Sequence, residues 1–357
     1  MPGVVVLILH PAARPGAGPL ECWVAAARGR IAERHRTGFL AAGAPDVRLL
    51  AGPPDDTSFG ARLRGFVERE RPDGVVVLGA GSVPLVRPAQ RRALLAAAAG
   101  PGPRALTNNR YSADVVAIAG VDVLLGLPDL ASDNALPRWL EEHAGYAVAE
   151  LRGWGLGIDV DGPLDLVLLR QAGRGAAGPP AGADLSRVEG ALERVAAVTA
   201  DRAQELVVTG RTSAASLRWL ERNAAARVRA LVEERGLRAA DPSAASATPL
   251  RRRPPASILG AVLDHEGPAA LGEVLAHLGD AALVDSRVLL AHRLEADEAA
   301  WPAAEDRYAS DLLLHERIGD AWLRELTRSA AEAAIPIVLG GHTLVGPGLR
   351  LAVRRHA

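Results

Sequence analysis

The chain has 357 residues, of which 49% are apolar and 23% are charged, and its formal net charge is −1. This composition is typical of globular proteins, and the length exceeds the usual size of one hydrophobic core, so we expect two domains. A net charge so close to zero provides no overall basic field, and nucleic acid is therefore not an expected partner. The chain contains no lysine, so arginine supplies all of its permanent positive side-chain charge. The chain thus has no P-loop lysine, Schiff-base lysine or lysine general base.

The one cysteine, Cys22, excludes an intramolecular disulfide and a cysteine-rich zinc site. We interpret it as a core residue of a helix expected over residues 20–42. The apolar run at residues 4–9 has the length of a strand and lacks a basic segment before it, so we expect neither a signal peptide nor a spanning helix. The expectation is a soluble, cytoplasmic protein that does not use a membrane as a partner.

Strands and helices alternate along the first half of the chain. Continuous apolar runs are typical of strands buried on both faces of a parallel sheet. The alternation favours an open, mostly parallel sheet with helices on both faces, in which ligands bind beyond the carboxyl ends of the strands. Expected strands cover residues 4–9, 46–50, 74–79, 114–118 and 146–151, and expected helices cover residues 20–42, 57–71, 88–98 and 136–143, with a further helix from Pro163.

Three carboxylates lie close together in Gly157-Ile158-Asp159-Val160-Asp161-Gly162-Pro163-Leu164-Asp165-Leu166. If residues 156–160 form a strand, Asp159 and Asp161 project to the same side. Such a pair is suited to Mg²⁺, which binds one or two carboxylates while phosphates and waters complete its octahedron. The alternative is an ordinary strand–turn–helix junction in which the Asp161 carboxylate caps the helix.

This order of elements, together with two motifs, resembles small nucleotidyltransferases. The motifs are Gly81-Ser82-Val83-Pro84-Leu85, after the third strand, and Asp159-Val160-Asp161-Gly162-Pro163-Leu164-Asp165-Leu166. The resemblance covers about residues 1–170. It is to the molybdenum-cofactor nucleotidyltransferase and phospholactate guanylyltransferase type, which has a glycosyltransferase-A-like fold.

The resemblance implies transfer of a nucleotidyl group from an NTP to a small-molecule acceptor. Asp159 and Asp161 would be the catalytic, metal-binding residues that hold Mg²⁺ on the phosphates. The residues that would surround the nucleotide in the first loop and after the third strand are Arg14, Gly16, Gly79, Gly81 and Ser82.

The chain departs from this family at two places. Ser82 occupies the position where the family usually has an aspartate, and the first loop offers one arginine, Arg14, and no lysine. Pro11 and Pro15 also remove backbone donors that a phosphate cradle would use. Two further interpretations therefore stay open: a catalytically silent nucleotide- or metabolite-binding protein, and a sugar-nucleotide-dependent glycosyltransferase.

A polar stretch, Thr107-Asn108-Asn109-Arg110-Tyr111-Ser112-Ala113-Asp114, lies between two apolar runs. Asn109 and Arg110 are candidates for recognition of the nucleotide or the acceptor, since arginine binds phosphate and carboxylate with two hydrogen bonds. The alternative is a polar turn whose asparagines bind their own backbone.

A segment rich in glycine, proline and alanine at residues 172–185 is interpreted as a linker between domains 1–171 and 186–357. The second domain is predicted to be α/β and its type is unknown; a second copy of the chain is a candidate partner. Its expected helices cover residues 186–201, 213–235 and 318–334, and its expected strands cover residues 205–209, 282–290, 335–339 and 349–353.

Two loops of the second domain carry candidate sites. Gly210-Arg211-Thr212-Ser213 lies between a strand and a helix, where Arg211, Thr212 and Ser213 could bind an anion. The alternative is a capped helix with a solvated arginine. Gly340-Gly341-His342 is glycine-rich and suits either close approach of a ligand or a tight turn between two strands. The basic cluster at residues 251–253 is expected to be a solvated loop.

Overall fold

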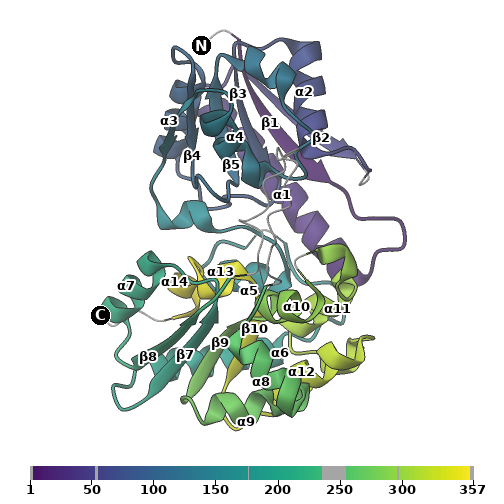
Figure 1. Cartoon of the computed structure of the whole chain (residues 1–357), viewed down its shortest axis with the longest axis vertical. Coiled ribbons are helices and arrows are strands. Elements are labelled where there is room, and N and C mark those ends of the chain that lie inside the picture. Colours follow the sequence, from purple (N-terminus) through teal and green to yellow (C-terminus); the bar gives the residue numbers. More distant parts are fainter. Residues whose placement is uncertain (1–2, 53–54, 176, 235–254, 296, 354–357) are drawn as a thin grey trace. The chain divides into compact units, whose positions relative to one another are not determined.

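The computed structural model describes residues 3–52, 55–175, 177–234, 255–295 and 297–353. These residues form two compact units (Figure 1). The first unit contains residues 3–15 and 25–159, and the second contains residues 16–24 and the described residues from 160 onward. The sequence placed a linker at residues 172–185, so the two divisions differ by the segment that holds helix α5 (Pro163–Gln171).

The first unit is built on a six-stranded sheet with the order β2-β1-β3-β5-β4-β6. Strand β5 runs antiparallel to both of its neighbours, and the other three pairings are parallel. The sheet is therefore open and mostly parallel, as predicted. Its strands are β1 (Val4–Pro11), β2 (Asp46–Gly52), β3 (Gly74–Gly79), β4 (Arg104–Thr107), β5 (Val115–Ala119) and β6 (Ala147–Glu150).

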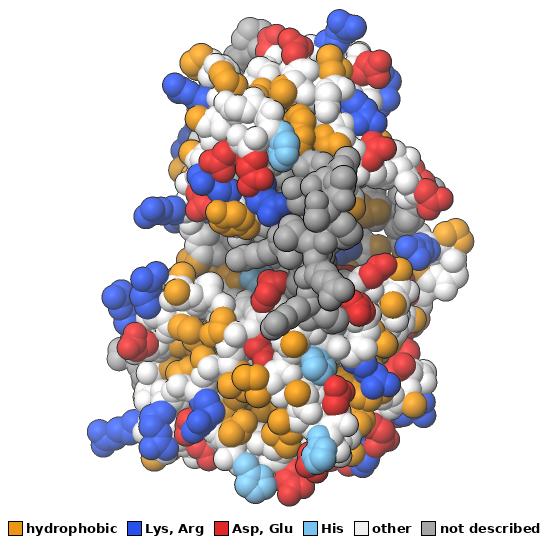
Figure 2. Space-filling view, in the orientation of Figure 1, with side chains coloured by type: hydrophobic (Ala, Val, Ile, Leu, Met, Phe, Trp, Pro, Cys, Tyr) orange, Lys and Arg blue, Asp and Glu red, His pale blue; other side chains and the backbone are white. Residues whose placement is uncertain are grey.

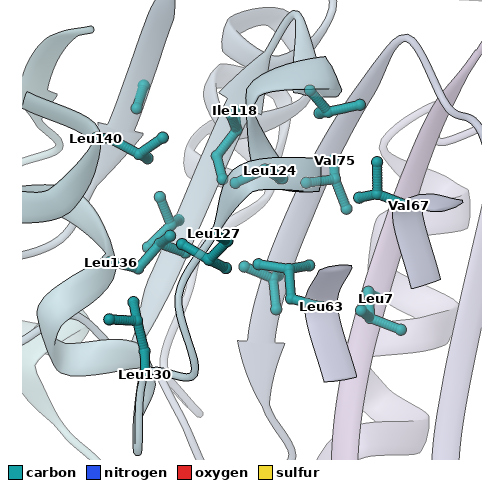
Figure 3. Close-up of a cluster of buried hydrophobic side chains, with 14 of the residues drawn as sticks. Leu7, Leu63, Val67, Val75, Ile118, Leu124, Leu127, Leu130, Leu136 and Leu140 are labelled. Atoms are coloured by element: carbon teal, nitrogen blue, oxygen red, sulfur yellow. The ribbon is translucent and has the colours of Figure 1, made fainter. Parts of the chain in front are cut away.

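Helices cover both faces of this sheet, which confirms the predicted layering. Leucines of α2 and α4 and of the 3₁₀ helix η1 (Val121–Gly126) pack with Leu7, Val75 and Ile118 on one face (Figure 3). Side chains of α1 and α3 pack on the other face. Each fully buried leucine contributes about 1.5–3 kcal/mol relative to an exposed one. The helices are α1 (Pro19–Ala41), α2 (Phe59–Glu70), α3 (Pro88–Ala98) and α4 (Leu136–Glu142), with the 3₁₀ helices η2 (Asp133–Ala135) and η3 (Trp154–Gly157).

Two expectations for the first unit are corrected by the structure. The run at residues 156–160 is not a strand, because η3 ends at Gly157 and Asp159 makes an isolated bridge. Glycines at positions 153, 155 and 157, in and just before this run, favour a turn over an extended strand. Strand β4 was not expected, since only four residues separate the Pro103 turn from the polar loop after Thr107.

The second unit is built on four parallel strands in the order β10-β9-β7-β8. Helix α6 packs against β7, β9 and β10. The predicted second α/β domain is thus confirmed. Its strands are β7 (Glu205–Gly210), β8 (Arg227–Val232), β9 (Ala281–Asp285) and β10 (Ile337–Gly340).

This unit contains ten of the described α-helices, together with the start of α1. Seven of the ten follow β8, and five of these seven have six residues or more. The ten helices are α5 (Pro163–Gln171), α6 (Ser186–Thr199), α7 (Ala214–Asn223), α8 (Ile258–Glu266), α9 (Leu271–Ala276), α10 (Ser286–Leu294), α11 (Ala304–Asp311), α12 (Ala321–Glu332), α13 (His342–Val345) and α14 (Leu349–Ala352).

Three expectations for the second unit are wrong. The helix expected over residues 213–235 ends at Asn223, and β8 follows as a strand beside β7. The strand-like run at 282–290 divides into β9 and α10, because Asp285 ends the strand. Residues 349–352 are helical rather than extended, so the glycine-rich loop after β10 does not join two strands. The basic cluster at 251–253 lies outside the described residues.

No helix in the described part of the chain is both long enough and apolar enough to cross a membrane. On the face shown in Figure 2, acidic and basic side chains are interspersed over both units.

Candidate functional site

The carboxyl edge of the first sheet is organised by the turn that follows β3. Strands β1 and β3 pair up to Leu9 and Gly79, and the Ala80 N–H then donates to the Leu9 carbonyl at 2.8 Å. Ser82 forms an antiparallel bridge with Asp159, and the Val83 N–H donates to the Ile158 carbonyl at 3.1 Å. The structure therefore brings together two of the predicted site residues, Ser82 and Asp159.

Val83 fixes this turn in an unusual backbone conformation. Its φ angle is +44°, which a β-branched residue rarely adopts, and its side chain is fully buried. Such a conformation costs about 1–3 kcal/mol and persists only when surrounding contacts hold it. Here the burial of Val83 and its hydrogen bond to Ile158 supply those contacts.

His35 supports the same turn from helix α1. The pKa of His35 is lowered to about 4, mainly by burial; the hydrogen bond to Ser82 opposes this shift, and the charges of Arg91 and Arg34 add to it. The neutral ring donates its Nε2–H to the Ser82 carbonyl at 2.8 Å. Its Nδ1 is buried and has no hydrogen-bond partner among the described residues. His35 was missed by the sequence reasoning, because nothing in its neighbourhood marks it apart from an ordinary helix residue.

Arginine charges act on two histidines near this edge. Burial lowers the pKa of His10, at the end of β1, and the nearby charge of Arg28 lowers it further. Desolvation lowers the pKa of Arg91, and the neighbouring charge of Arg34 has the same effect. Arg34 and Arg91 thus act electrostatically on His35, which contacts the Ser82 carbonyl.

The first loop, which the resemblance places around the nucleotide, is divided between the two units. Arg14 is exposed in the first unit, whereas Gly16 lies in a turn of the second unit with a φ angle of +79°. In that second unit, the Glu305 carboxylate accepts the N–H groups of Leu20 and Glu21 at 3.1 Å. The negative group at the N-terminus of α1 is thus the protein's own glutamate, 285 residues away in sequence from Leu20.

The polar loop between β4 and β5 contains a local turn and places Arg110 beside a hollow. The Asn109 Oδ1 accepts the Tyr111 N–H at 2.9 Å, so Asn109 makes the local turn described as the alternative. Arg110 donates to the Val148 carbonyl at 3.0 Å and pairs with Glu141 at 3.3 Å. Arg110 also lines an open hollow of about 380 Å³ together with Tyr111, Glu150 and Arg152.

Asn108 is the residue that holds this loop. Its Oδ1 accepts the N–H groups of Asp114 and Val115 at 2.9 and 3.2 Å. Its Nδ2 donates to the Asp114 carboxylate at 2.6 Å and to the Leu156 carbonyl at 2.8 Å. Asn108 therefore links the loop to the segment that leads to Asp159.

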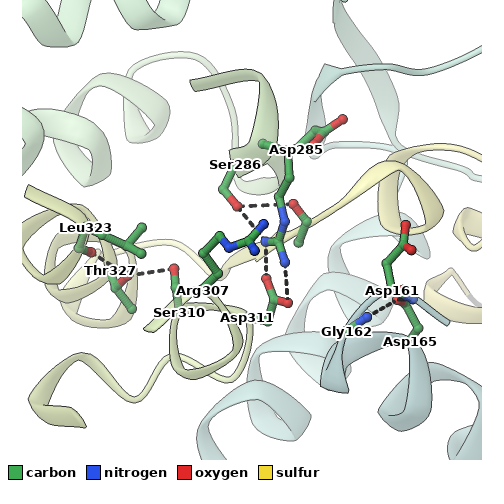
Figure 4. A network of polar contacts seen from close by, with 12 residues as sticks. Asp161, Gly162, Asp165, Asp285, Ser286, Arg307, Ser310, Asp311, Leu323 and Thr327 are labelled. Carbon is green, nitrogen blue, oxygen red and sulfur yellow. Dashed lines mark hydrogen bonds and ion pairs between the residues drawn. The ribbon is translucent and has the colours of Figure 1, made fainter. Parts of the chain in front are cut away.

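The carboxyl edge of the second sheet holds a separate group of charged residues (Figure 4). Arg211 follows β7, and its Nε and Nη2 donate to the Asp285 carboxylate at 2.6 and 3.0 Å. Asp285 ends the neighbouring strand β9 and its side chain has no exposed surface. Burial alone would raise the Asp285 pKa, but the paired Arg211 charge and its hydrogen bonds hold that pKa below its ordinary value.

A second buried pair joins Arg287 and Asp311. The Arg287 Nη2 donates to the Asp311 carboxylate at 2.7 Å, and the Nη1 donates to the same carboxylate and to the Ser286 hydroxyl. Burial raises the pKa of Asp311 although the Arg287 charge opposes that shift. Neither Asp285 nor Asp311 was assigned a role from sequence, since each meets an arginine only through the fold.

Asp165, rather than Asp161, caps helix α5. The Asp165 Oδ2 accepts the N–H groups of Asp161 and Gly162 at 2.8 and 2.9 Å (Figure 4). Gly162 is the N-cap residue, and Asp165 occupies the third helical position of a capping box. Burial raises the pKa of Asp165 to about 8, and the charge of Asp161 adds to the shift. The expected capping role of Asp161 is therefore wrong. Because Asp161 belongs to the second unit, the structure does not join it to Asp159 in one unit.

The two loops predicted as sites in the second unit differ in character. Ser213 caps helix α7 by accepting the Ser216 N–H at 3.1 Å, as its alternative interpretation stated. The Thr212 hydroxyl is buried and has no hydrogen-bond partner among the described residues. At Gly340, an added Cβ would lie 2.5 Å from the Leu164 Cδ2, so this glycine allows α5 to pack closely on β10.

No group of three or more histidine, cysteine, aspartate or glutamate side chains in the described part of the chain could hold a metal ion. A metal bound here would therefore need further ligands from substrate or water.

The comparisons with known proteins add little to this geometry. No family model matches the chain, and no curated protein matches it. Among solved structures, the chain is similar to a CMP-2-keto-3-deoxy-manno-octonic acid synthetase in complex with CTP, with 17% sequence identity and a TM-score of 0.28. The match covers 47% of this chain and 96% of that protein. A similarity at this TM-score carries no argument about function.

Proposed function

We propose that the first unit binds a nucleoside triphosphate at the carboxyl edge of its sheet and transfers the nucleotidyl group to a small acceptor. The bridge between Ser82 and Asp159 is the observation that supports this most. It places the turn after β3 and the first aspartate of the Asp-x-Asp stretch at one point of the edge. Ligands of open α/β sheets bind at this edge.

The electrostatics of the edge suit a nucleotide. His10 and His35 are neutral near pH 7 because their pKa values are lowered, and the permanent charges of Arg34 and Arg91 lie close to His35. A polyphosphate adjacent to these arginines is stabilised by their charge. The arginines of α1 and α3 would then replace the basic first loop of the resembled family.

Magnesium fits this edge only as an ion that arrives with the nucleotide. Asp159 and the Ser82 hydroxyl would hold it, and phosphates and waters would complete the coordination. When bound, the ion would neutralise charge that develops on the phosphates during transfer. The protein's own residues would orient the nucleotide: His35 would fix the Ser82 turn, and Asn108 would fix the segment before Asp159.

The acceptor would bind in the hollow lined by Arg110, Tyr111, Glu150 and Arg152. Two guanidinium groups in this hollow favour an acceptor that carries a carboxylate or phosphate. The open shape of the hollow suits a small molecule that is released after the reaction.

A catalytically silent nucleotide-binding protein is the second candidate. Ser82 carries no charge where the resembled family usually has a metal-binding aspartate. Glu305 also occupies the N-terminus of α1 in the second unit, where a phosphate would otherwise be stabilised. Both observations favour binding without transfer.

The test is a thermal-shift panel of the full chain with each NTP and several sugar nucleotides, with and without Mg²⁺. A nucleotide at a hundredfold its Kd is expected to stabilise the protein by about 2.7 kcal/mol. Asp159→Asn should abolish the Mg²⁺-dependent shift, whereas Asp129→Asn, at an exposed ion pair with Arg64, should retain it. Asp161→Asn tests in the same panel whether the second predicted ligand contributes.

Pyrophosphate release then separates the two candidates. An NTP that stabilises the protein and yields pyrophosphate with an acidic acceptor supports transfer. Stabilisation without pyrophosphate supports the silent protein, and a shift with sugar nucleotides alone supports a glycosyltransferase. A flat panel, or a shift that Asp159→Asn leaves unchanged, would rule out a nucleotide site at this edge.

A further inference from the structure

We propose that the second unit has a ligand site of its own, in which Arg211 and Thr212 bind the carboxylate of a small 2-hydroxy or 2-amino carboxylic acid. The site lies at the carboxyl edge of the parallel sheet β10-β9-β7-β8. All of its residues belong to the second unit, and it does not rest on the proposed nucleotide site.

The topology selects this position. The connection from β7 leads to β8 on one side of it, and β9 then pairs on the other side. The direction of winding thus changes between β7 and β9, and parallel α/β sheets bind ligands at such a switch point. Arg211 follows β7 and Asp285 ends β9, so their bidentate pair stands at this point.

Arg211 keeps a second binding edge. Asp285 occupies its Nε and Nη2, and the Nη1 has no hydrogen-bond partner among the described residues. A guanidinium held at the Nε side can still bind another carboxylate through Nη1 and the remaining N–H of Nη2. The Arg211 side chain is 20% exposed whereas that of Asp285 is fully buried, so the remaining edge is the accessible one.

Thr212 supplies an independent observation that points to a ligand. Its side chain is 8% exposed, and its hydroxyl has no hydrogen-bond partner among the described residues. A buried hydroxyl without a hydrogen-bond partner destabilises the folded protein. This destabilisation is removed when a ligand oxygen accepts a hydrogen bond from the hydroxyl.

The balance of charge selects the class of ligand. Asp285 and Asp311 neutralise Arg211 and Arg287. The exposed Asp161 adds one negative charge, which acts on Arg211. Asp161 repels a doubly charged phosphate, whereas the hydroxyl or ammonium group next to a carboxylate can donate a hydrogen bond to Asp161.

The test is calorimetric titration of the full chain with serine, aspartate and malate, and with inorganic phosphate as the competing anion. Thr212→Val removes the hydroxyl while it keeps the shape of the side chain, so it should weaken binding of the carboxylic acid about threefold to tenfold. Thr212→Ser restores a hydroxyl and should bind as the unaltered protein does.

Arg211→Lys retains the charge but removes the second binding edge, and its binding loss should exceed that of Thr212→Val. Circular dichroism of the Arg211→Lys variant shows whether it is folded. If this variant is unfolded, binding by Thr212→Val tests the proposal. The matched control is Arg229→Lys, at the exposed pair with Glu205 in the same sheet, which should bind normally.

Absence of binding by all three acids would overturn the proposal, as would binding that Thr212→Val leaves unchanged. Tighter binding of inorganic phosphate than of any carboxylic acid would overturn the assigned ligand class. Because NTPs are absent from these titrations, a failure here leaves the nucleotide panel unaffected, and the two proposals are tested separately.

Discussion

At the level of single residues, the second unit concentrates buried charge around one uncharged acid. Asp165 accepts two backbone N–H groups, and its raised pKa means that the folded state retains a proton there. Arg287 and Asp311 form a nearby pair that is almost completely buried. Two predictions about stability follow from these residues. One concerns the effect of pH on Asp165, and the other concerns the loss of the carboxylate that pairs with Arg287.

Asp165→Asn should become increasingly more stable than the unaltered protein as the pH rises from about 4 to about 8. Over this range the unfolded Asp165 has released its proton while the folded one retains it, so the free energy of unfolding of the unaltered protein falls with pH. The slope of the difference approaches about 1.4 kcal/mol per pH unit and becomes flat above pH 8. The asparagine carbonyl still caps the helix.

Urea unfolding of both proteins at a series of pH values measures this difference. Other titrating groups are common to both proteins and cancel. Parallel curves from pH 4 to 8 would show that Asp165 is ionised in the folded state.

Asp311→Ala should destabilise the protein by about 3–5 kcal/mol, because it leaves the buried Arg287 charge without its carboxylate. The matched control is Glu325→Ala, which breaks an exposed pair with Arg328 and should cost about 0–1 kcal/mol. Denaturant unfolding compares the two. Equal losses would mean that Arg287 is solvated in the folded state.

At the level of elements, the accuracy of the sequence prediction follows the strength of the local signals. Helix α3 was predicted with both of its ends, since Pro88 is favoured at a helix start and a glycine and proline turn follows. The helix predicted through residues 213–235 failed because arginine, alanine and leucine are good helix formers, whereas β8 is set by its pairing with β7. The pairing of β8 with β7 therefore determines the structure of this segment, against the helix preference of its residues.

One contact between elements predicts a large effect from a small substitution. Gly74 begins β3, and an added Cβ would lie 2.0 Å from the Ala98 carbonyl at the end of α3. Backbone atoms on that side cannot rotate away, so Gly74→Ala should destabilise the protein by about 1–3 kcal/mol or more. Gly178→Ala, with no atom within 4 Å of the added Cβ, should change stability little. Thermal unfolding of both variants tests this difference.

At the level of the whole molecule, each unit presents a polar group at the carboxyl edge of its own sheet. The sequence identified parts of both: Ser82 and Asp159 in the first, and Arg211 and Thr212 in the second. It missed two residues that hold them, because His35 and Asp285 reach Ser82 and Arg211 from distant parts of the chain. Local motifs therefore located the edges, and only the fold showed which side chains are already occupied.

The two proposed sites should respond to different substitutions. Asp159→Asn should remove the nucleotide shift and leave binding of the carboxylic acid intact, and Thr212→Val should do the reverse. Thermal-shift assays of both variants with both ligand classes measure this. If either substitution weakened both ligands, the sites would not be independent.

The hairpin between β4 and β5 offers a place for protein engineering. Asn108, at the start of the loop, forms hydrogen bonds to Asp114 and Val115 at its end and to Leu156 outside it. Tyr111, in the middle of the loop, has half of its surface exposed. Residues 110–112 can therefore be randomised in a library while the strands on either side keep their register. Under the proposed function, selection from such a library should change the preference for the acceptor, because Arg110 and Tyr111 line the hollow assigned to it.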